Sequence, residues 1–179
     1  MMRQSHSFPY AETEDLQLLE LPYRGGETSM LILLPRAQDG IGGLEESLDL
    51  GRVTDLIDAL ERRSVSVSIP RLRFEAAFEL SSALGRLGMA DAFQLDHADF
   101  SGISKERRLA LEAVFHKAFI AVDEEGTEAA AVTVATTLDA AAAMDKPVPF
   151  IADHPFVFLI RHRSSGAILF MGRVMDPTP

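Results

Sequence analysis

The sequence contains no cysteine, so the chain can form no disulfide, no zinc–thiolate site and no cysteine nucleophile, and its stability must come from packing. No apolar run is long enough to span a membrane, and residues 1–10 lack the apolar centre of a signal peptide. Positive charge is also scarce, since 17 Lys and Arg residues face 27 Asp and Glu residues, for a net charge of -10. This balance opposes binding to phosphate backbones, and we expect neither nucleic acid nor a membrane as a partner.

The sequence also lacks the common catalytic motifs. It has no G-x-S-x-G nucleophile elbow, no H-E-x-x-H zinc motif and no glycine-rich phosphate loop. Asp96, His97 and Asp99 could imitate a metal or acid–base cluster, but three polar residues in a predicted loop are far more often a solvated turn or cap. We therefore predict that the protein is not an enzyme and uses neither a metal nor a cofactor.

Apolar residues make up 47% of the 179 positions, which is enough to fill the core of a globular domain. Two short apolar runs, residues 16–23 and 29–35, flank a glycine-containing turn and predict a buried hairpin. Between residues 44 and 60, apolar residues recur every three or four positions, which predicts short amphipathic helices, with Asp49 a candidate cap of the second.

The remaining patterns predict further strands and one more helix. Residues 64–69 alternate between serine and β-branched residues, as in a half-buried strand, which we expect to resume at residues 72–74 after Pro70. Residues 81–89 predict a short helix with Leu84 and Leu87 facing inward, and residues 109–123 favour a strand. Residues 156–160 and 168–174 predict two buried strands joined by a turn at 164–166. Together these elements predict an α+β fold.

Ordered motifs along nearly the whole chain resemble the serpin family of serine protease inhibitors. The clearest is the run FHKA at 115–118, which continues into DEEGTEAAA at 123–131 and is similar to the sheet strand and proximal hinge of inhibitory serpins. Other blocks in family order are ELPY at 20–23, VSIPR at 67–71, LGRLGM at 84–89, FSGI at 100–103, DHPFVFLI at 153–160 and FMGRV at 170–174.

The resemblance implies a fold of mixed and antiparallel sheets with short helices and an exposed reactive-centre loop. Serpins are about twice this length, so residues 1–179 would form the C-terminal half of a single serpin domain, with the loop at about residues 124–149. The N-terminal half of the domain is then an expected partner. For the full-length protein we expect an extracellular location, with any signal peptide outside this chain.

The resemblance further implies inhibition by a suicide mechanism. A serine protease cleaves the loop, and the freed loop end inserts into the main sheet and carries the covalently bound protease with it. Thr127, Ala129 and Ala131 would face inward on insertion, and none is charged or large. The alternative interpretation is that this Ala/Thr-rich run is only a flexible linker. The hinge so predicted comprises Glu124, Glu125, Gly126, Thr127, Glu128, Ala129, Ala130 and Ala131.

The predicted position of the cleaved bond depends on the end of the loop from which residues are counted. Counting forward from Gly126 places it between Ala140 and Ala141, whereas counting backward from Phe150 or Pro155 gives Ala143 or Met144. We favour Ala140 because hinge length governs insertion. All of these residues suit an elastase- or subtilisin-like protease, and no Arg or Lys lies between Gly126 and Asp145 for a trypsin-like one.

Four further residues are expected to have structural roles. The family resemblance makes His116 a hydrogen-bonding group where the sheet opens, next to Lys117, and it places Pro155 and Phe156 in the C-terminal signature. Two alternatives to inhibition remain open. The protein could be a non-inhibitory serpin-like protein, or this half could be inactive alone and associate through an unpaired sheet edge.

Overall fold

The computed structural model describes residues 1–105, 108–122 and 146–177. The chain divides into two compact units, one formed by Met1–Leu72 with Val122–Pro179 and the other by Arg73–Ala121. No helix among the described residues is both long and apolar enough to cross a membrane.

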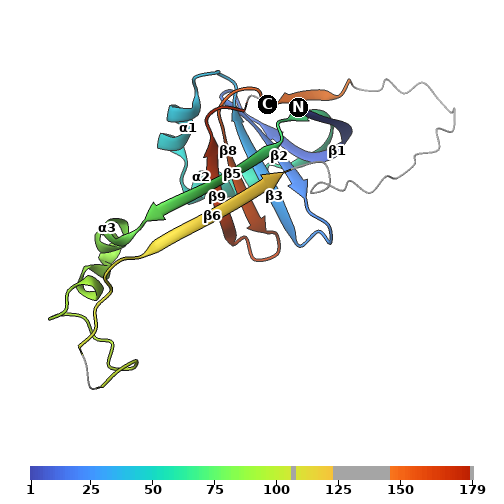
Figure 1. The fold of residues 1–179 in the computed structure, drawn as a ribbon. Coiled ribbons are helices and arrows are strands. Elements are labelled where there is room, and N and C mark those ends of the chain that lie inside the picture. Colours follow the sequence, from blue (N-terminus) through green and yellow to red (C-terminus); the bar gives the residue numbers. More distant parts are fainter. Residues whose placement is uncertain (106–107, 123–145, 178–179) are drawn as a thin grey trace. The chain divides into compact units, whose positions relative to one another are not determined.

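A seven-stranded sheet forms the first unit (Figure 1), with the strand order β7-β4-β1-β2-β3-β8-β9. Neighbouring strands pair antiparallel, except that β4 and β7 are parallel. The strands are β1 (Met2–Glu12), β2 (Leu16–Pro22), β3 (Thr28–Pro35), β4 (Glu61–Ile69), β7 (Val148–Ile151), β8 (Phe156–His162) and β9 (Ile168–Val174).

The predicted hairpin of residues 16–35 is confirmed and forms the centre of this sheet. β2 pairs with β3 from Leu16 opposite Pro35 to Pro22 opposite Ser29. The connecting turn places Gly25 and Gly26 at φ 89° and 73°, backbone angles that residues with a Cβ atom rarely adopt. Almost every side chain of both strands is buried, and β1 and β8 pair with the two outer edges of the hairpin.

Two short helices, α1 (Ile41–Ser47) and α2 (Leu50–Asp58), were also predicted correctly. The Asp49 carboxylate accepts a hydrogen bond of 2.7 Å from the backbone N–H of Arg52 and so caps α2. The apolar residues of the helices pack on one face of the sheet and form a core cluster with its strands. The buried members are Ala11, Leu16, Leu18, Leu31, Leu33, Leu44, Val53, Leu56, Val157 and Leu159.

Three features of this unit differ from the expectation. The sequence pattern did not predict β1 or β7, whose side chains do not show a sustained alternation of buried and exposed residues. The strand at 168–174 exists as β9, but it is not buried as predicted, because it is the last strand in the sheet order and β8 covers only one of its edges.

The second unit contains a two-stranded antiparallel ribbon of β5 (Leu72–Glu79) and β6 (Phe115–Val122) (Figure 1). Between them lie α3 (Ser81–Leu84), the π-helical turn η1 (Gly85–Met89) and the 3-10 helix η2 (Ala90–Phe93). The predicted helix over 81–89 is thus interrupted, and Gly88 has a φ of 103° inside it. The inward placement of Leu87 was wrong, since its side chain is 82% exposed.

Candidate functional site: the strands on either side of residues 123–145

The predicted hinge, residues 124–131, and the candidate bond residues Ala140, Ala141, Ala143 and Met144 lie outside the described residues. The structure does describe the strands that precede and follow this segment. β6 ends at Val122, and β7 begins at Val148. β6 lies almost entirely in the second unit and β7 in the first, so each strand is considered with the residues that hold it within its own unit.

The β7 strand is fixed mainly by backbone pairing and one large side chain. It runs parallel to β4, with Val65 opposite Val148 and Ser68 opposite Ile151. The backbone N–H of Ala152 donates to the Ser68 carbonyl at 2.9 Å and extends this pairing by one residue. Phe150 is completely buried, so the strand contributes an aromatic ring to the core despite its four-residue length.

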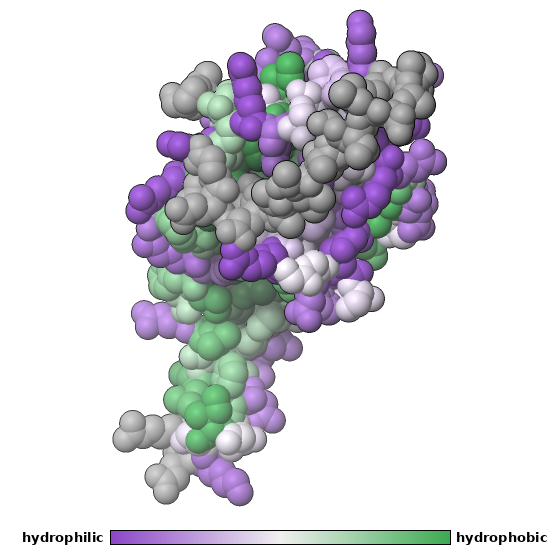
Figure 2. Space-filling model, turned by 90° about the vertical axis from the view of Figure 1, so that its right-hand side faces the viewer, coloured by the Kyte–Doolittle hydropathy of each residue, from purple (hydrophilic) through white to green (hydrophobic). Residues whose placement is uncertain are grey.

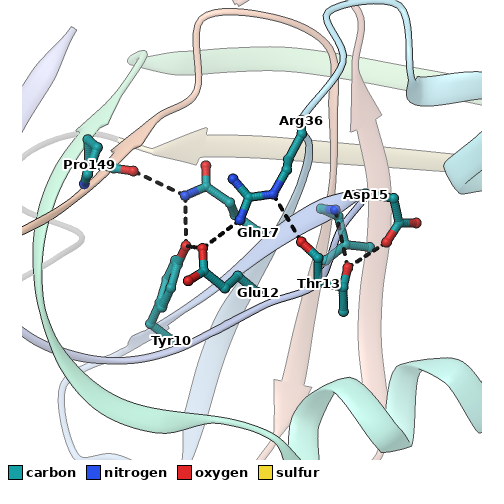
Figure 3. Close-up of polar contacts among 8 residues, drawn as sticks. Tyr10, Glu12, Thr13, Asp15, Gln17, Arg36 and Pro149 are labelled. Carbon is teal, nitrogen blue, oxygen red and sulfur yellow. Dashed lines mark hydrogen bonds and ion pairs between the residues drawn. The ribbon is translucent and has the colours of Figure 1, made fainter.

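A polar network connects β7 to the β1–β2 hairpin (Figure 3). The Gln17 Nε2 group donates to the Pro149 carbonyl at 3.1 Å and to the Tyr10 hydroxyl at 2.7 Å. The Tyr10 hydroxyl donates onward to Glu12 Oε2 at 2.9 Å, and Arg36 Nη2 donates to the same oxygen at 2.6 Å. Gln17 thus makes a side-chain contact between β2 and β7, the strand that follows residues 123–145.

The pKa values of Tyr10 and Glu12 in this network are shifted in opposite directions. Burial raises the pKa of Tyr10, an effect that the hydrogen bond from Gln17 partly opposes. The hydrogen bonds from Tyr10 and Arg36 lower the pKa of the Glu12 carboxyl below its ordinary value. The network therefore holds a neutral phenol against an ionised carboxylate at neutral pH, with the phenol as donor.

The C-terminal signature residues lie at the start of β8. His154 bridges two elements, because its Nδ1 lies 2.8 Å from Asp153 Oδ1 and its Nε2 lies 2.6 Å from the carbonyl oxygen of Pro35 at the end of β3. Pro155 is half-buried, and Phe156, the first residue of β8, is buried. Phe156 pairs with Val174 of β9, and the structural role expected of Pro155 and Phe156 stays a prediction.

His116 and Lys117, the two residues of β6 that were predicted from the sequence to have structural roles, are both exposed. Lys117 pairs with Glu75 of β5 at an N···O distance of 2.6 Å, and the Arg73 guanidinium lies 5.9 Å from the centre of the Phe119 ring. These contacts join the two strands of the ribbon across one face. β6 has β5 as its only neighbour among the described strands, so its other edge offers backbone groups for a further strand.

One polar cluster was missed by the sequence reasoning. Glu20 lies in β2 with only 2% exposure, and its Oε1 accepts hydrogen bonds from Ser29 Oγ at 2.7 Å and Arg161 Nη2 at 2.7 Å. The guanidinium of Arg163 adds a third, longer contact from Nε at 3.3 Å. A signal was present, because Glu20 is the single charge in the apolar run of residues 16–22, but its two arginine partners stand more than 140 positions away along the chain.

The Asp96 region has the solvated character that its sequence indicated. Arg108 donates to Asp96 at 3.3 Å, His97 lies 3.6 Å from Asp91, and Asp99 accepts from the backbone of Ser101, all at exposed positions. Within the described part of the chain, no group of three or more His, Asp or Glu residues is arranged to hold a metal ion.

Comparison with known proteins finds a matching family model, similar sequences and a similar solved structure. The family model for serpins, the serine protease inhibitors, matches residues 1–177. The chain belongs to the serpin family. It is 46% identical over 178 residues to an uncharacterized serpin-like protein of Thermococcus kodakarensis, and 44% identical over 186 residues to the leukocyte elastase inhibitor of Homo sapiens.

The matches cover this serpin chain almost completely but its relatives only in part. The two alignments include 99% of this chain, against 41% of the Thermococcus protein and 48% of the human one. The structure of uncleaved ovalbumin superposes on 98% of the chain with a TM-score of 0.84 and 30% identity, and 47% of ovalbumin is covered. The chain thus spans less than half the length of these relatives, and its fold is that of a partial serpin.

Proposed function

We propose that this chain is the loop-bearing half of a serpin-type inhibitor that traps serine proteases. The observation that carries the proposal is the hinge sequence at residues 124–131, which directly follows β6 in a chain of the serpin family. The family match supports protease inhibition in general, and the small residues of the hinge support the trapping mechanism in particular.

The proposed trap begins as ordinary proteolysis. The protease serine oxygen attacks the carbonyl carbon of Ala140, the amide bond to Ala141 breaks, and the nitrogen of Ala141 leaves as a protonated amine. An ester then joins the protease to the loop. Insertion of the hinge into the main sheet removes the ester from the protease's hydrolytic machinery before water can cleave it.

The exposed edge of β6 supports this proposal, because an inserting strand needs an unpaired neighbour. Side chains alternate between the two faces of a strand, so Thr127, Ala129 and Ala131 would share the buried face. None of them is charged, and all are small. Burial of this face would therefore carry no unpaired charge into the sheet.

For the target, we propose a protease of elastase- or subtilisin-like preference. The candidate residues before the cut are Ala140, with Ala143 and Met144 as alternatives, and each fits a small or apolar specificity pocket. Similarity to proteins named leukocyte elastase inhibitor is in keeping with this preference. We also propose an extracellular location for the full-length protein, which detection of the protein in culture medium rather than in washed cells would test.

A second candidate is a serpin-like protein without inhibitory activity, either as a complete molecule or as an inactive half. The observation in its favour is that the chain covers less than half of each relative. A serpin sheet that ends at β6 lacks the strand that would flank an inserted loop on its other side. The completed domain is therefore the form in which inhibition should be tested.

The test joins this chain to the part of the human leukocyte elastase inhibitor that it does not match, and incubates the product with elastase or subtilisin. We expect a covalent complex that survives SDS, and mass spectrometry of the released peptide would locate the cleaved bond. Thr127→Arg should convert the protein to a cleaved substrate without a complex. Glu128→Arg, on the opposite face, is the matched control and should still trap. Cleavage of the unsubstituted protein without any complex would favour the second candidate.

A further inference from the structure

His154 makes its polar contacts inside the first unit, where the connection between β7 and β8 meets the end of β3. Apolar side chains are exposed at many surface positions (Figure 2), and the rest of a serpin domain is their expected cover, because the chain spans less than half of its relatives. His154 needs no such cover. Both of its polar partners belong to this chain, and its side chain is only 14% exposed.

Both ring nitrogens of His154 face groups that accept hydrogen bonds. Nδ1 lies 2.8 Å from Oδ1 of Asp153, and Nε2 lies 2.6 Å from the carbonyl oxygen of Pro35. Neither a backbone carbonyl nor an ionised carboxylate has a hydrogen to donate. A neutral imidazole carries one N–H and can make only one of these two hydrogen bonds, whereas an imidazolium donates to both. The geometry therefore fits the charged ring.

The Pro35 carbonyl lies just beyond the paired part of β3 and β8. Their pairing ends at Leu33 opposite Val157, and its continuation by two residues would bring Pro35 opposite Pro155. Proline has no backbone N–H, so Pro155 cannot donate to β3 at this point. The His154 ring supplies a donor there instead, and it ties the chain that enters β8 to the end of β3.

The charges around this contact favour the imidazolium. Asp153 is the only carboxylate in ion-pair contact with His154 among the described residues. The register of β8 with β9, continued by two residues, places Asp176 opposite His154 as a second negative group. Arg36 at the end of β3 is already bound by Glu12. The other charged residues on the adjoining segments are Asp39 after β3 and Arg71 after β4.

His162, at the other end of β8, has partners of a different kind. Its Nδ1 lies 2.8 Å from Ser165 Oγ, and its Nε2 lies 3.4 Å from Ser164 Oγ. A hydroxyl can donate or accept, so these contacts suit a neutral ring as well as a charged one. Only His154 is therefore placed so that its two contacts together require both ring hydrogens.

We propose that His154 is a pH-dependent latch, which holds the β7–β8 connection to the end of β3 while its ring is protonated. When the ring loses a proton, the half-exposed Asp153 carboxylate turns away into water, and the bond to Pro35 changes from a charge-assisted hydrogen bond to a weaker neutral one. The latch loosens as the pH rises through about 5 to 8, the range in which histidine loses its charge. Because folding favours the charged form, the stabilisation is present at low pH and is lost as the pH rises.

Hydrogen exchange of the Ala152 amide tests the latch in the 179-residue chain, and no protease enters the experiment, so its result is independent of the proposed function. This amide donates to the Ser68 carbonyl of β4 at the start of the β7–β8 connection. After correction for the intrinsic pH dependence of exchange, its opening constant should rise about tenfold between about pH 5.5 and about pH 8.5, the difference between a charge-assisted and a neutral hydrogen bond. The opening constant of the Ile32 amide in the central strand β3 should not show this rise.

Three variants separate the latch from other effects of pH. His154→Gln keeps a donor for the Pro35 carbonyl but does not titrate, so the rise at Ala152 should disappear. Asp153→Asn replaces the carboxylate by an amide that can donate as well as accept, so opening at low pH should increase and the rise should become smaller. His162→Gln is the matched control and should keep the full tenfold rise.

Several results would overturn the assignment. An opening constant at Ala152 that is equal at the two pH values in the unsubstituted protein would do so, as would a rise that persists in His154→Gln. Loss of the rise in His162→Gln would place the titrating group at the other end of β8. If His154→Gln did not fold, Asp153→Asn would decide, because its carboxylate is half exposed and an unchanged rise would contradict the latch.

Discussion

Arg161 of β8 donates a hydrogen bond of 2.7 Å from Nη2 to Oε1 of Glu20 on β2, and both side chains are largely removed from solvent, with 11% and 2% exposure. β3 lies between these two strands and contributes the Ser29 hydroxyl to the same oxygen. One buried carboxylate thus joins three adjacent strands. Arg163 extends the cluster beyond the end of β8 and donates from Nη1 to the Gly26 carbonyl in the β2–β3 turn.

Glu20→Ala should strongly destabilise the fold. Removal of the carboxylate leaves Arg161 buried without its counter-charge, and breaking a buried pair in this way costs about 3–5 kcal/mol. Urea unfolding would measure the change in free energy. Glu45→Ala is the matched control, because its ion pair with Arg173 is on the surface and is worth about 0–1 kcal/mol. Equal losses in the two variants would contradict the role assigned to Glu20.

The same carboxylate should make stability depend on pH in the acid range. Burial acts to raise the pKa of Glu20, but the hydrogen bonds from Arg161 and Ser29 and the nearby arginine charges outweigh it, and the pKa lies below its ordinary value of 4.5. A group whose pKa is lowered by folding stabilises the protein above its unfolded pKa, and this contribution disappears as the pH falls through the folded pKa.

We therefore expect the free energy of unfolding to decline as the pH falls below about 4.5, and Glu20→Gln to flatten that decline. Urea unfolding at a series of pH values would measure both slopes. Glu12 and Asp15 also have lowered pKa values, so part of the slope should remain in the variant. An unchanged slope in Glu20→Gln would mean that Glu20 does not contribute to it.

The sequence predicted the elements whose signals are local. The hairpin turn has its glycines, α2 has Asp49 as its cap three residues before the N–H that it binds, and β4 alternates with period two. Whether an apolar strand is central or at an edge depends instead on its neighbours in space. For this reason residues 168–174 were predicted as a strand correctly and as buried wrongly.

The site could be predicted only in outline. The motifs predicted a hinge, candidate bonds and structural roles for His116, Lys117, Pro155 and Phe156, and all of these stay predictions. Contacts such as Gln17 with Pro149, or Glu20 with Arg161, join residues more than 130 positions apart, and chain periodicity contains no signal for them. The contact of Glu20 with Arg161 follows from the strand order, which places β3 between β2 and β8, whereas β1 and β4 lie between the strands of Gln17 and Pro149.

Gly172→Ala should destabilise the outer part of the sheet. A Cβ atom at Gly172 would lie 2.6 Å from Cζ and 2.8 Å from Cε1 of the Phe158 ring, which is much closer than van der Waals contact allows. Overpacking of this kind costs about 1–3 kcal/mol. Thermal or urea unfolding would measure it, and Phe158→Leu should recover part of the loss in the double variant by making room.

The control for this experiment is Gly43→Ala in α1. A Cβ atom there would meet nothing within 4 Å. Since alanine is the better helix former, this substitution should stabilise the protein by about 0.5–1 kcal/mol. A loss of stability in Gly172→Ala together with a gain in Gly43→Ala would separate the steric effect at Gly172 from the general cost of glycine. Stabilisation at both positions would show that the Phe158 ring moves aside at little cost.

Gln17→Leu should loosen β7, the strand that follows residues 123–145. The substitution keeps the volume of residue 17 but removes the donor to the Pro149 carbonyl, and a hydrogen bond of this kind contributes about 0.5–1.5 kcal/mol. Because β7 is short, much of that loss should appear as more frequent local opening. Hydrogen exchange of the Ala152 amide, which donates to the Ser68 carbonyl of β4, would measure it against the Ile32 amide in the central strand β3.

Tyr10→Phe should loosen β7 less than Gln17→Leu does. It removes the hydroxyl that accepts from Gln17 but leaves Gln17 free to donate to Pro149, so exchange at Ala152 should increase less than in Gln17→Leu. Exchange at Ile32 should remain slow in both variants, because that residue is buried between β2 and β8. If Ala152 exchanged at the same rate in all three proteins, pairing with β4 and the buried Phe150 ring would be sufficient to hold the strand.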